Sequence, residues 1–172
     1  MDNTKTFQLN KIWGEILFYT AGLVLVYLTP VLSHLFAIPL YYLEPMRIIV
    51  IISLVYTGRF NSYILALTLP VFSYLVSGHP LFFKAGIMTG ELLLNIFIFD
   101  LLSYKIKNIF IVTFLSIILS KMLYYLFKYI FISTNLLHGT LVSTPIIIQL
   151  ILTVVLACLI FYILNKKQYK SN

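Results

Sequence analysis

The stretch SGHPLFFKAGIMTGELLLN, residues 77–95, begins as a turn and continues into a long apolar segment. Its polar residues stand out because the chain has few of them. Of 172 residues, 61% are hydrophobic and only 10% are charged, and the mean hydropathy is +1.01. A soluble globular domain carries roughly 25% charged residues. The composition therefore predicts an all-α, polytopic integral membrane protein with its apolar runs in lipid.

Apolar runs recur along the whole chain, and several approach the roughly 20 residues that cross a bilayer as a helix. We expect six transmembrane helices in a single domain, residues 1–172. Their approximate bounds are 12–36, 46–57, 62–76, 81–104, 108–132 and 144–164. The second and third spans are short for a full crossing, which predicts tilted or broken helices there. Five spans with a re-entrant pair are the alternative.

Lysine and arginine are unequally divided between the two sides that six spans define. With the N-terminus inside, the inner side receives eight of the twelve cations: Lys5, Lys11, Arg59, Lys105, Lys107, Lys166, Lys167 and Lys170. The positive-inside rule therefore favours an N-in, C-in topology. The net charge of +7 is then explained by topology and by contact with anionic lipid. Nothing in the pattern predicts binding to nucleic acid.

Other polar residues gather toward the outer face under this topology. All three histidines, His34, His79 and His138, fall on that side. Glu44 and Arg47 lie at the same level, in the proline-rich segment between the first two spans. The simple explanation is that outer loops need polar residues.

The fourth span carries the most specific pattern. Lys84, Glu91 and Asn95 are seven and four residues apart and so share one helical face. Glu91 lies roughly 10 Å deeper than Lys84 at 1.5 Å per residue. A lone charge near the bilayer centre costs on the order of 3 kcal/mol, so Glu91 needs a partner or a ligand. Lys121, near the middle of the fifth span, is the expected partner by depth, and Gln149 lies at a similar level in the sixth.

These residues predict a pocket between spans four, five and six that is open to the outside. Its expected members are Glu91, Asn95, Lys121 and Gln149. One acid, one base and two amides suit a small polar or zwitterionic ligand. A structural pair between Glu91 and Lys121, a proton relay and contact with a lipid headgroup are the alternatives. Gly86 and Gly90 form a GxxxG pair, which predicts close approach of a neighbouring helix to this span.

Motifs for enzymatic chemistry are absent from the sequence. It contains no GxxxxGK[ST] loop, no HExxH, no GxSxG and no pair of acids at metal-ligand spacing. Three scattered histidines make a poor metal site. We therefore expect neither an enzyme, nor a cofactor, nor a metal. With no internal repeat, the chain is also small for a self-sufficient secondary transporter.

The run PVFSYLVSGHPLFFKAGIMTGELLLN, residues 70–95, resembles the substrate-binding S components of energy-coupling factor (ECF) transporters. Many members have a proline-containing third helix, a G-x-P turn, and a fourth helix with Glu-Leu about a dozen residues further on. Gly78-His79-Pro80 and Glu91-Leu92 match that arrangement. The chain's size, six expected spans and inside termini are also similar to this family.

The resemblance implies capture of a vitamin or similar micronutrient at the outer face of a prokaryotic plasma membrane. A membrane T component and two cytoplasmic ATPase subunits would then drive its uptake. The loop after helix one and the ends of helices four to six bind substrate in this family. The implied site residues are Glu44, Arg47, His79, Lys84, Glu91, Asn95, Lys121, His138 and Gln149. The family's A-x-x-x-A docking pattern on helix one is reduced here to Ala21 and Gly22, because residue 25 is leucine.

The main alternative is a non-transport membrane scaffold, such as a cell-shape subunit. An integral subunit of a lipid or prenyl pathway is a second alternative. Such proteins share the basic inner side, but they give no reason for a buried acid and a buried lysine at one depth. The sequence does not indicate which micronutrient would be bound.

Overall fold

The computed structural model describes residues 3–37, 39–78 and 80–171, with side chains described between residues 12 and 166. These residues form the following elements: α1 (Asn3–Phe36), the 3-10 helix η1 (Leu40–Leu43), α2 (Pro45–Tyr56), α3 (Arg59–Ser77), α4 (Phe82–Ser103), α5 (Ile109–Ser133) and α6 (Ile146–Ser171). The described part contains no strand. The predicted all-α class is therefore confirmed, and most predicted span bounds agree with the helices to within a few residues.

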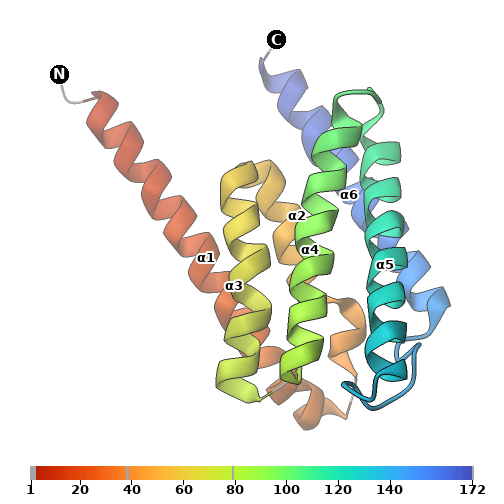
Figure 1. Cartoon of the computed structure of the whole chain (residues 1–172). Helices are drawn as coiled ribbons and strands as arrows, with labels where there is room; N and C mark the ends of the chain where they lie inside the picture. The colour runs from red at the N-terminus through yellow and green to blue at the C-terminus, as the bar shows by residue number, and fades with distance from the viewer. Residues whose placement is uncertain (1–2, 38, 79, 172) are drawn as a thin grey trace.

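Consecutive helices run in alternating directions, so the start of α1 and the end of α6 lie at the same end of the bundle (Figure 1). We call this the terminal end; the turns at residues 57–58 and 104–108 lie there as well. The opposite end, the loop end, carries the connections at residues 37–44, 78–81 and 134–145. The two ends thus differ in how much irregular chain they contain.

Among the described residues, five helices are long and apolar enough to cross a membrane: Ile12–Phe36, Arg59–Ser77, Phe82–Ser103, Ile109–Ser133 and Ile146–Lys166. This is consistent with a membrane-embedded, multi-pass protein. The helix α2 has 12 residues, or about 18 Å of length, against a hydrocarbon core of about 30 Å. It is too short to cross alone, so the number of six spans stays a prediction.

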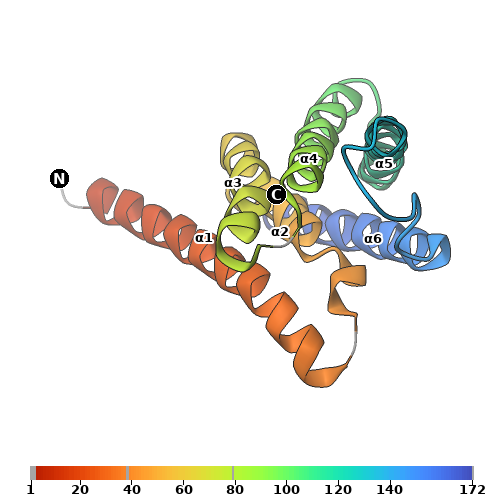
Figure 2. The ribbon, with the colours of Figure 1, turned by 60° about the horizontal axis from the view of Figure 1, so that its bottom comes forward.

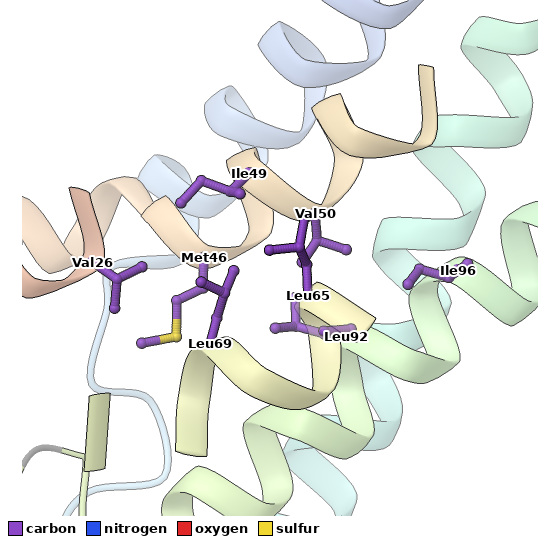
Figure 3. Close-up of a cluster of buried hydrophobic side chains, with 9 residues drawn as sticks. Val26, Met46, Ile49, Val50, Leu65, Leu69, Leu92 and Ile96 are labelled. Carbon is purple, nitrogen blue, oxygen red and sulfur yellow. The ribbon is translucent and has the colours of Figure 1, made fainter. Parts of the chain in front are cut away.

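The short helix α2 is the packing centre of the bundle. Figure 2 shows it in the middle of the arrangement, and it packs against α1, α3, α4 and α6. Its side chains belong to both apolar clusters of the core. Figure 3 shows the first cluster, which joins α1 to α4: Val26, Met46, Ile49, Val50, Leu65, Ala66, Leu69, Leu92 and Ile96. The second joins α2 to α5 and α6: Ile51, Val55, Ile117, Leu156 and Ile160.

In contrast, α1 is the least packed of the long helices. Its first half leans away from the bundle in both views (Figures 1 and 2), and only 11% of its apolar span is buried, against 28–33% in the other four. The buried positions of its described part are Val26, in the first core cluster, and Gly22, where an added Cβ would lie 3.0 Å from Ile49 of α2. Gly22 of the predicted docking patch therefore packs inside the chain, while Ala21 is exposed.

The predicted close approach at Gly86 and Gly90 is wrong. A Cβ added to either glycine would meet nothing within 4 Å. Both glycines line an apolar groove of about 410 Å³ between α3, α4 and α5, whose walls include the rings of Tyr74, Phe83 and Phe131. At these two positions no neighbouring helix of the described chain packs against the glycine face of α4. The helix α4 still packs between α3 and α5, as expected for a central element.

Candidate functional site

A cavity of about 700 Å³ reaches from the loop end into the bundle. Ligand pockets for small molecules span about 300–1,000 Å³, so its size suits a single small molecule. Residues of all six α-helices and of the loop-end connections line it: Val26, Thr29, Pro30, Ser33, His34, Ala37, Pro39, Tyr41, Glu44, Pro45, Met46, Arg47, Ser73, Pro80, Lys84, Met88, Glu91, Leu92, Lys121, Tyr124, Tyr125, Ser143, Thr144 and Gln149. Apolar and charged side chains thus meet around one space.

Four charged side chains form a connected group on the wall, which we call the four-charge cluster: Glu44, Arg47, Glu91 and Lys121. The Nη2 of Arg47 donates to Oε1 of Glu91, and the Nζ of Lys121 donates to Oε1 of Glu44. The Nε of Arg47 lies 3.1 Å from Oε2 of Glu44. Two acids and two bases leave the cluster formally neutral. Arg47 is 3% exposed and Glu91 is 8% exposed, so these charges are held by protein.

The fold brings these residues together from distant parts of the chain. Arg47 lies in the first turn of α2, Glu91 near the middle of α4, and Lys121 near the middle of α5. Glu44 lies between η1 and α2 with a φ of 50° and a ψ of 55°. This left-handed conformation costs a non-glycine residue roughly 1–2 kcal/mol. The ion pairs of Glu44 with Arg47 and Lys121 offset that cost and fix the entrance of α2.

Gln149 connects the four-charge cluster to α6. Its Oε1 accepts hydrogen bonds from Nζ of Lys121 at 3.0 Å and from the hydroxyl of Tyr125 at 2.9 Å. Its Nε2 donates to the backbone carbonyl of Thr144 at 2.7 Å. The amide is therefore oriented by α5 and by the loop before α6. This arrangement holds the ammonium of Lys121 at a defined position on the wall.

Arg47 keeps a donor without a hydrogen-bond partner. Its Nη1 is fully buried and makes no hydrogen bond within the described part of the chain. Its Nε is close enough to the Glu44 carboxylate to form an ion pair, but the two groups do not form a hydrogen bond. Buried polar groups in proteins are nearly always hydrogen-bonded. The described chain therefore leaves two donors of Arg47 without a hydrogen bond, beside a cavity that this residue helps to line.

Two further lysines lie toward the loop end of the cavity. Lys84 lines the cavity two helical turns before Glu91 on α4. Lys128 is 3% exposed; its Nζ lies 3.4 Å from Oγ of Ser143 and 5.8 Å from the ring centroid of Tyr124. A snorkelling lysine keeps its charged head in water. Lys128 instead turns its head toward residues of the cavity wall.

The structure brings six of the nine predicted binding residues to this cavity: Glu44, Arg47, Lys84, Glu91, Lys121 and Gln149. His138 is exposed in the loop between α5 and α6 and does not line the cavity. His79 lies outside the described residues. The wall also includes residues of α1 that were not predicted, among them Thr29, Ser33 and His34. Thr29 and Ser33 lie one helical turn apart in the sequence, and this spacing could have predicted a polar face on α1.

Asn95 does not line the cavity, although it was predicted to. It is 1% exposed, and its Nδ2 donates to Oγ of Ser120 at 3.2 Å. Asn95 lies one turn beyond Glu91, where α4 and α5 pack directly against each other. It shares the helical face of Glu91, but the cavity has ended at that depth. Asn95 therefore joins two helices instead of facing a ligand.

The predicted pairing of Lys121 with Glu91 is also wrong. Lys121 binds the carboxylate of Glu44, and Arg47 binds that of Glu91. The prediction that Lys121 and Glu91 lie at the same depth is correct, because both belong to the four-charge cluster. The sequence interpretation placed Glu44 and Arg47 in a loop above the pocket. In the structure α2 begins at Pro45 and carries Arg47 into the core, which inserts a second cation beside Glu91.

Comparison of the chain with protein-family models, with curated proteins and with solved structures found no match. The cavity and its side chains are therefore what supports a functional interpretation.

Proposed function

We propose that the chain is the membrane-embedded substrate-binding (S) subunit of an ECF-type importer. It captures a vitamin or similar small micronutrient at the outer face, for ATP-driven uptake by partner subunits in a prokaryotic plasma membrane. The observation that carries the proposal is the cavity of about 700 Å³, whose wall includes the charged side chains of the four-charge cluster. Such a space with few, defined polar groups is typical of small-molecule sites.

The combination of charge and volume favours binding over a purely structural role. Replacing a buried ion pair by well-packed apolar side chains is often neutral or stabilising, so two such pairs are not explained by stability. A structural pair also needs no space around it. Here Glu44, Arg47, Glu91 and Lys121 all line the cavity. A ligand that interacts with them gives a reason for both features.

In this proposal the chain has six spans, with its termini inside and its loop end outside. The basic residues support this orientation, because Arg59, Lys105 and Lys107 lie at the terminal end, the end at which α1 begins and α6 ends. The short helix α2 makes the second pass together with the segment before it. The cavity then faces the side from which a micronutrient arrives.

Uptake against a gradient requires an energy source, and the sequence carries no Walker motif. The proposed partners are a membrane T component and two cytoplasmic ATPase subunits. The exposed face of α1, which includes Ala21, is the proposed docking surface on this chain. It is suitable because α1 is the least buried long helix and leaves apolar side chains such as Trp13 and Leu17 uncovered.

The test is to purify the full chain in a mild detergent and identify co-purifying small molecules by mass spectrometry. We expect a micronutrient with the wild type and with Asp100→Asn, a matched change at the terminal end. We expect its loss with Glu91→Gln, which keeps the shape of the side chain and removes its charge. An unaltered ligand content in Glu91→Gln would contradict the assignment of this residue.

A second arm asks for partners. Co-expression with a T component and ATPases should give a complex that survives purification, and Ala21→Trp should weaken it. A cell-shape or lipid-pathway scaffold, the alternative function, should yield neither a small molecule nor ATPases. That joint outcome with the wild type would overturn the proposed function.

A further inference from the structure

The charges around the cavity are balanced at one end and unbalanced at the other. The four-charge cluster is neutral, because its two bases are matched by its two acids. Lys84 lines the same cavity nearer to the loop end, and it makes no ion pair or hydrogen bond with the described residues. The loop-end part of the cavity therefore carries at least one uncompensated cation.

Lys128 adds a second cation to this part. It is 3% exposed, and its Nζ contacts only the hydroxyl of Ser143 and the ring of Tyr124, both of which line the cavity. Neither contact neutralises an ammonium group. Lys84 near the start of α4 and Lys128 in the last turns of α5 lie where these helices meet, since the rings of Phe83 and Phe131 are 6.0 Å apart. Lys84, which is partly buried and lines the cavity, and Lys128, which is buried against two of the lining residues, thus make no ion pair with an acidic side chain of the described chain.

No acid of the described chain is placed to neutralise these lysines. The chain has five acidic residues: Asp2, Glu15, Glu44, Glu91 and Asp100. Glu44 and Glu91 are engaged by the four-charge cluster, and Asp100 pairs with Arg59 at the terminal end. Glu15 lies in the first half of α1, toward the terminal end, and Asp2 is outside the described residues. The described chain therefore supplies no carboxylate to Lys84 or Lys128.

A buried, unpaired ammonium is costly, and a second one nearby raises that cost. A bound oxyanion lowers both costs, because its negative charge offsets the ammonium charges and it accepts charge-assisted hydrogen bonds from lysine. We propose that Lys84 and Lys128 form an oxyanion-binding subsite at the loop end of the cavity, and that the captured molecule is a carboxylic acid or a phosphate ester. This inference rests on the proposed function and specifies the chemical class of its substrate.

The remaining wall indicates the rest of that molecule. Lys84 and Glu91 are seven residues apart on α4, or about 10 Å. Met88 and Leu92 line the cavity from the same helix, and the ring of Tyr124 lines it from α5. At the far end lies the four-charge cluster, which is formally neutral. The ligand has an anionic head at Lys84, an apolar or aromatic body, and an uncharged polar group at the other end.

The experiment measures thermal stabilisation of the full chain in nanodiscs of zwitterionic phosphatidylcholine. The probes are acid and neutral forms of single micronutrients: biotin and biotinamide, nicotinate and nicotinamide, pantothenate and panthenol, pyridoxal phosphate and pyridoxal. Molecules that co-purify with each variant are identified by mass spectrometry in both ion modes. We expect the co-purifying molecule to be an acid, and any pair that binds to bind through its acid member at least about tenfold more tightly.

The variants separate a binding role from a structural one. Lys84→Met and Lys128→Met keep the apolar stem and remove the charge, and each should weaken binding of the acid by about ten- to a hundredfold. Without ligand, both variants should unfold at the same or a higher temperature than the wild type, because a charge without an acidic partner is removed. Lys84→Arg keeps the charge and should retain most binding. Lys107→Met, at an exposed position of the terminal end, is the matched control and should bind as the wild type does.

Each other outcome has a defined meaning. A neutral or cationic co-purifying molecule, or an acid preference that persists in Lys84→Met, would overturn the oxyanion subsite and leave the proposed function intact. Absence of any bound small molecule in the wild type would overturn the proposed function and this inference together. A second preparation in nanodiscs containing phosphatidylglycerol tests the lipid source. Retention of that lipid by the wild type, its loss in Lys84→Met, and no small acid would assign the lysines to a lipid headgroup instead.

Discussion

Two groups of ion pairs lie toward opposite ends of this bundle, and they differ in what surrounds them. At the terminal end, Nε of Arg59 lies 2.9 Å from Oδ1 of Asp100, and the Arg59 side chain is 53% exposed. Arg59 also donates to the hydroxyl of Tyr104 at 3.2 Å. In the four-charge cluster, by contrast, the side chains of Arg47 and Glu91 are 4% and 9% exposed. Both groups join basic to acidic side chains. They differ in the basic partner, because Arg59 is 53% exposed, whereas the Asp100 side chain is 17% exposed.

The difference determines what each group can do. An exposed pair contributes little, about 0–1 kcal/mol, because water or lipid headgroups replace a lost partner. In a buried pair, removal of one partner leaves an uncompensated charge and costs about 3–5 kcal/mol. The Arg59–Asp100 pair therefore joins α3 to α4 at an interface position. The four-charge cluster holds charges in a defined geometry beside a cavity, which is what recognition of a ligand requires.

Among these substitutions, removal of Arg47 should lower the free energy of unfolding the most. Arg47→Met leaves Glu91 buried without its cation, and we expect a loss of about 3–5 kcal/mol in the free energy of unfolding. Titration with SDS from mixed micelles measures it. The double variant Arg47→Met, Glu91→Leu should recover most of the loss, because both charges are gone. A loss below about 1 kcal/mol in the single variant would show that water reaches Glu91.

Removal of Lys121 should have a smaller effect, because Glu44 keeps Arg47 as a partner. Lys121→Met loses its bonds to Glu44 and Gln149, and we expect a cost of about 1–3 kcal/mol. A double-mutant cycle with Glu44→Gln should give a coupling energy above about 0.5 kcal/mol. Additive effects of the two substitutions would mean that the pair does not form.

The left-handed conformation of Glu44 offers a test of the backbone beside the cluster. Glu44→Ala and Glu44→Gly both remove the carboxylate, so they lose the same ion pairs. Glycine adopts a φ of 50° freely, and we expect the glycine variant to be more stable than the alanine variant by about 1 kcal/mol. Equal stability of the two would indicate that residue 44 leaves this conformation once its ion pairs are lost.

The smallest effect is expected at the terminal end. Asp100→Asn should change the free energy of unfolding by less than about 1 kcal/mol, with a decreasing effect as salt is raised. The same titration with Arg59→Gln provides the partner variant. A cost comparable to that of Arg47→Met would remove the contrast between the two groups and would assign Asp100 a buried role.

Much of the candidate site could be predicted because charged residues are rare in this chain. Glu91 and Lys121 interrupt long apolar runs, and a charge at that depth must meet a partner or a ligand. Depth along a helix follows from the rise per residue, so their common level was available from sequence. The helices themselves follow from apolar runs ended by Gly58 and by the turn at Gly78, which has a φ of 66°.

The identity of the partners could not be read in this way. Which faces of two helices meet depends on packing, and α2 packs at the centre because its apolar residues join both core clusters. That placement carries Arg47 to Glu91. Asn95 and Gly86 are further examples. Asn95 lies in the tight interface with α5, and Gly86 lies in an open groove. Helical spacing alone predicts that Asn95 faces a ligand and that Gly86 faces a neighbouring helix.

The sequence by itself determined that this is an all-helical protein suited to a membrane, where its helices lie, and which few charges needed an explanation. These properties depend on composition and on local geometry, which each segment carries alone. Only the tertiary structure decided that Glu44 binds Lys121, that Arg47 binds Glu91, and that Lys84 and Lys128 are left without an acid. Pairing is a property of helices brought together, because a side chain's neighbours in the low-dielectric core come from other segments.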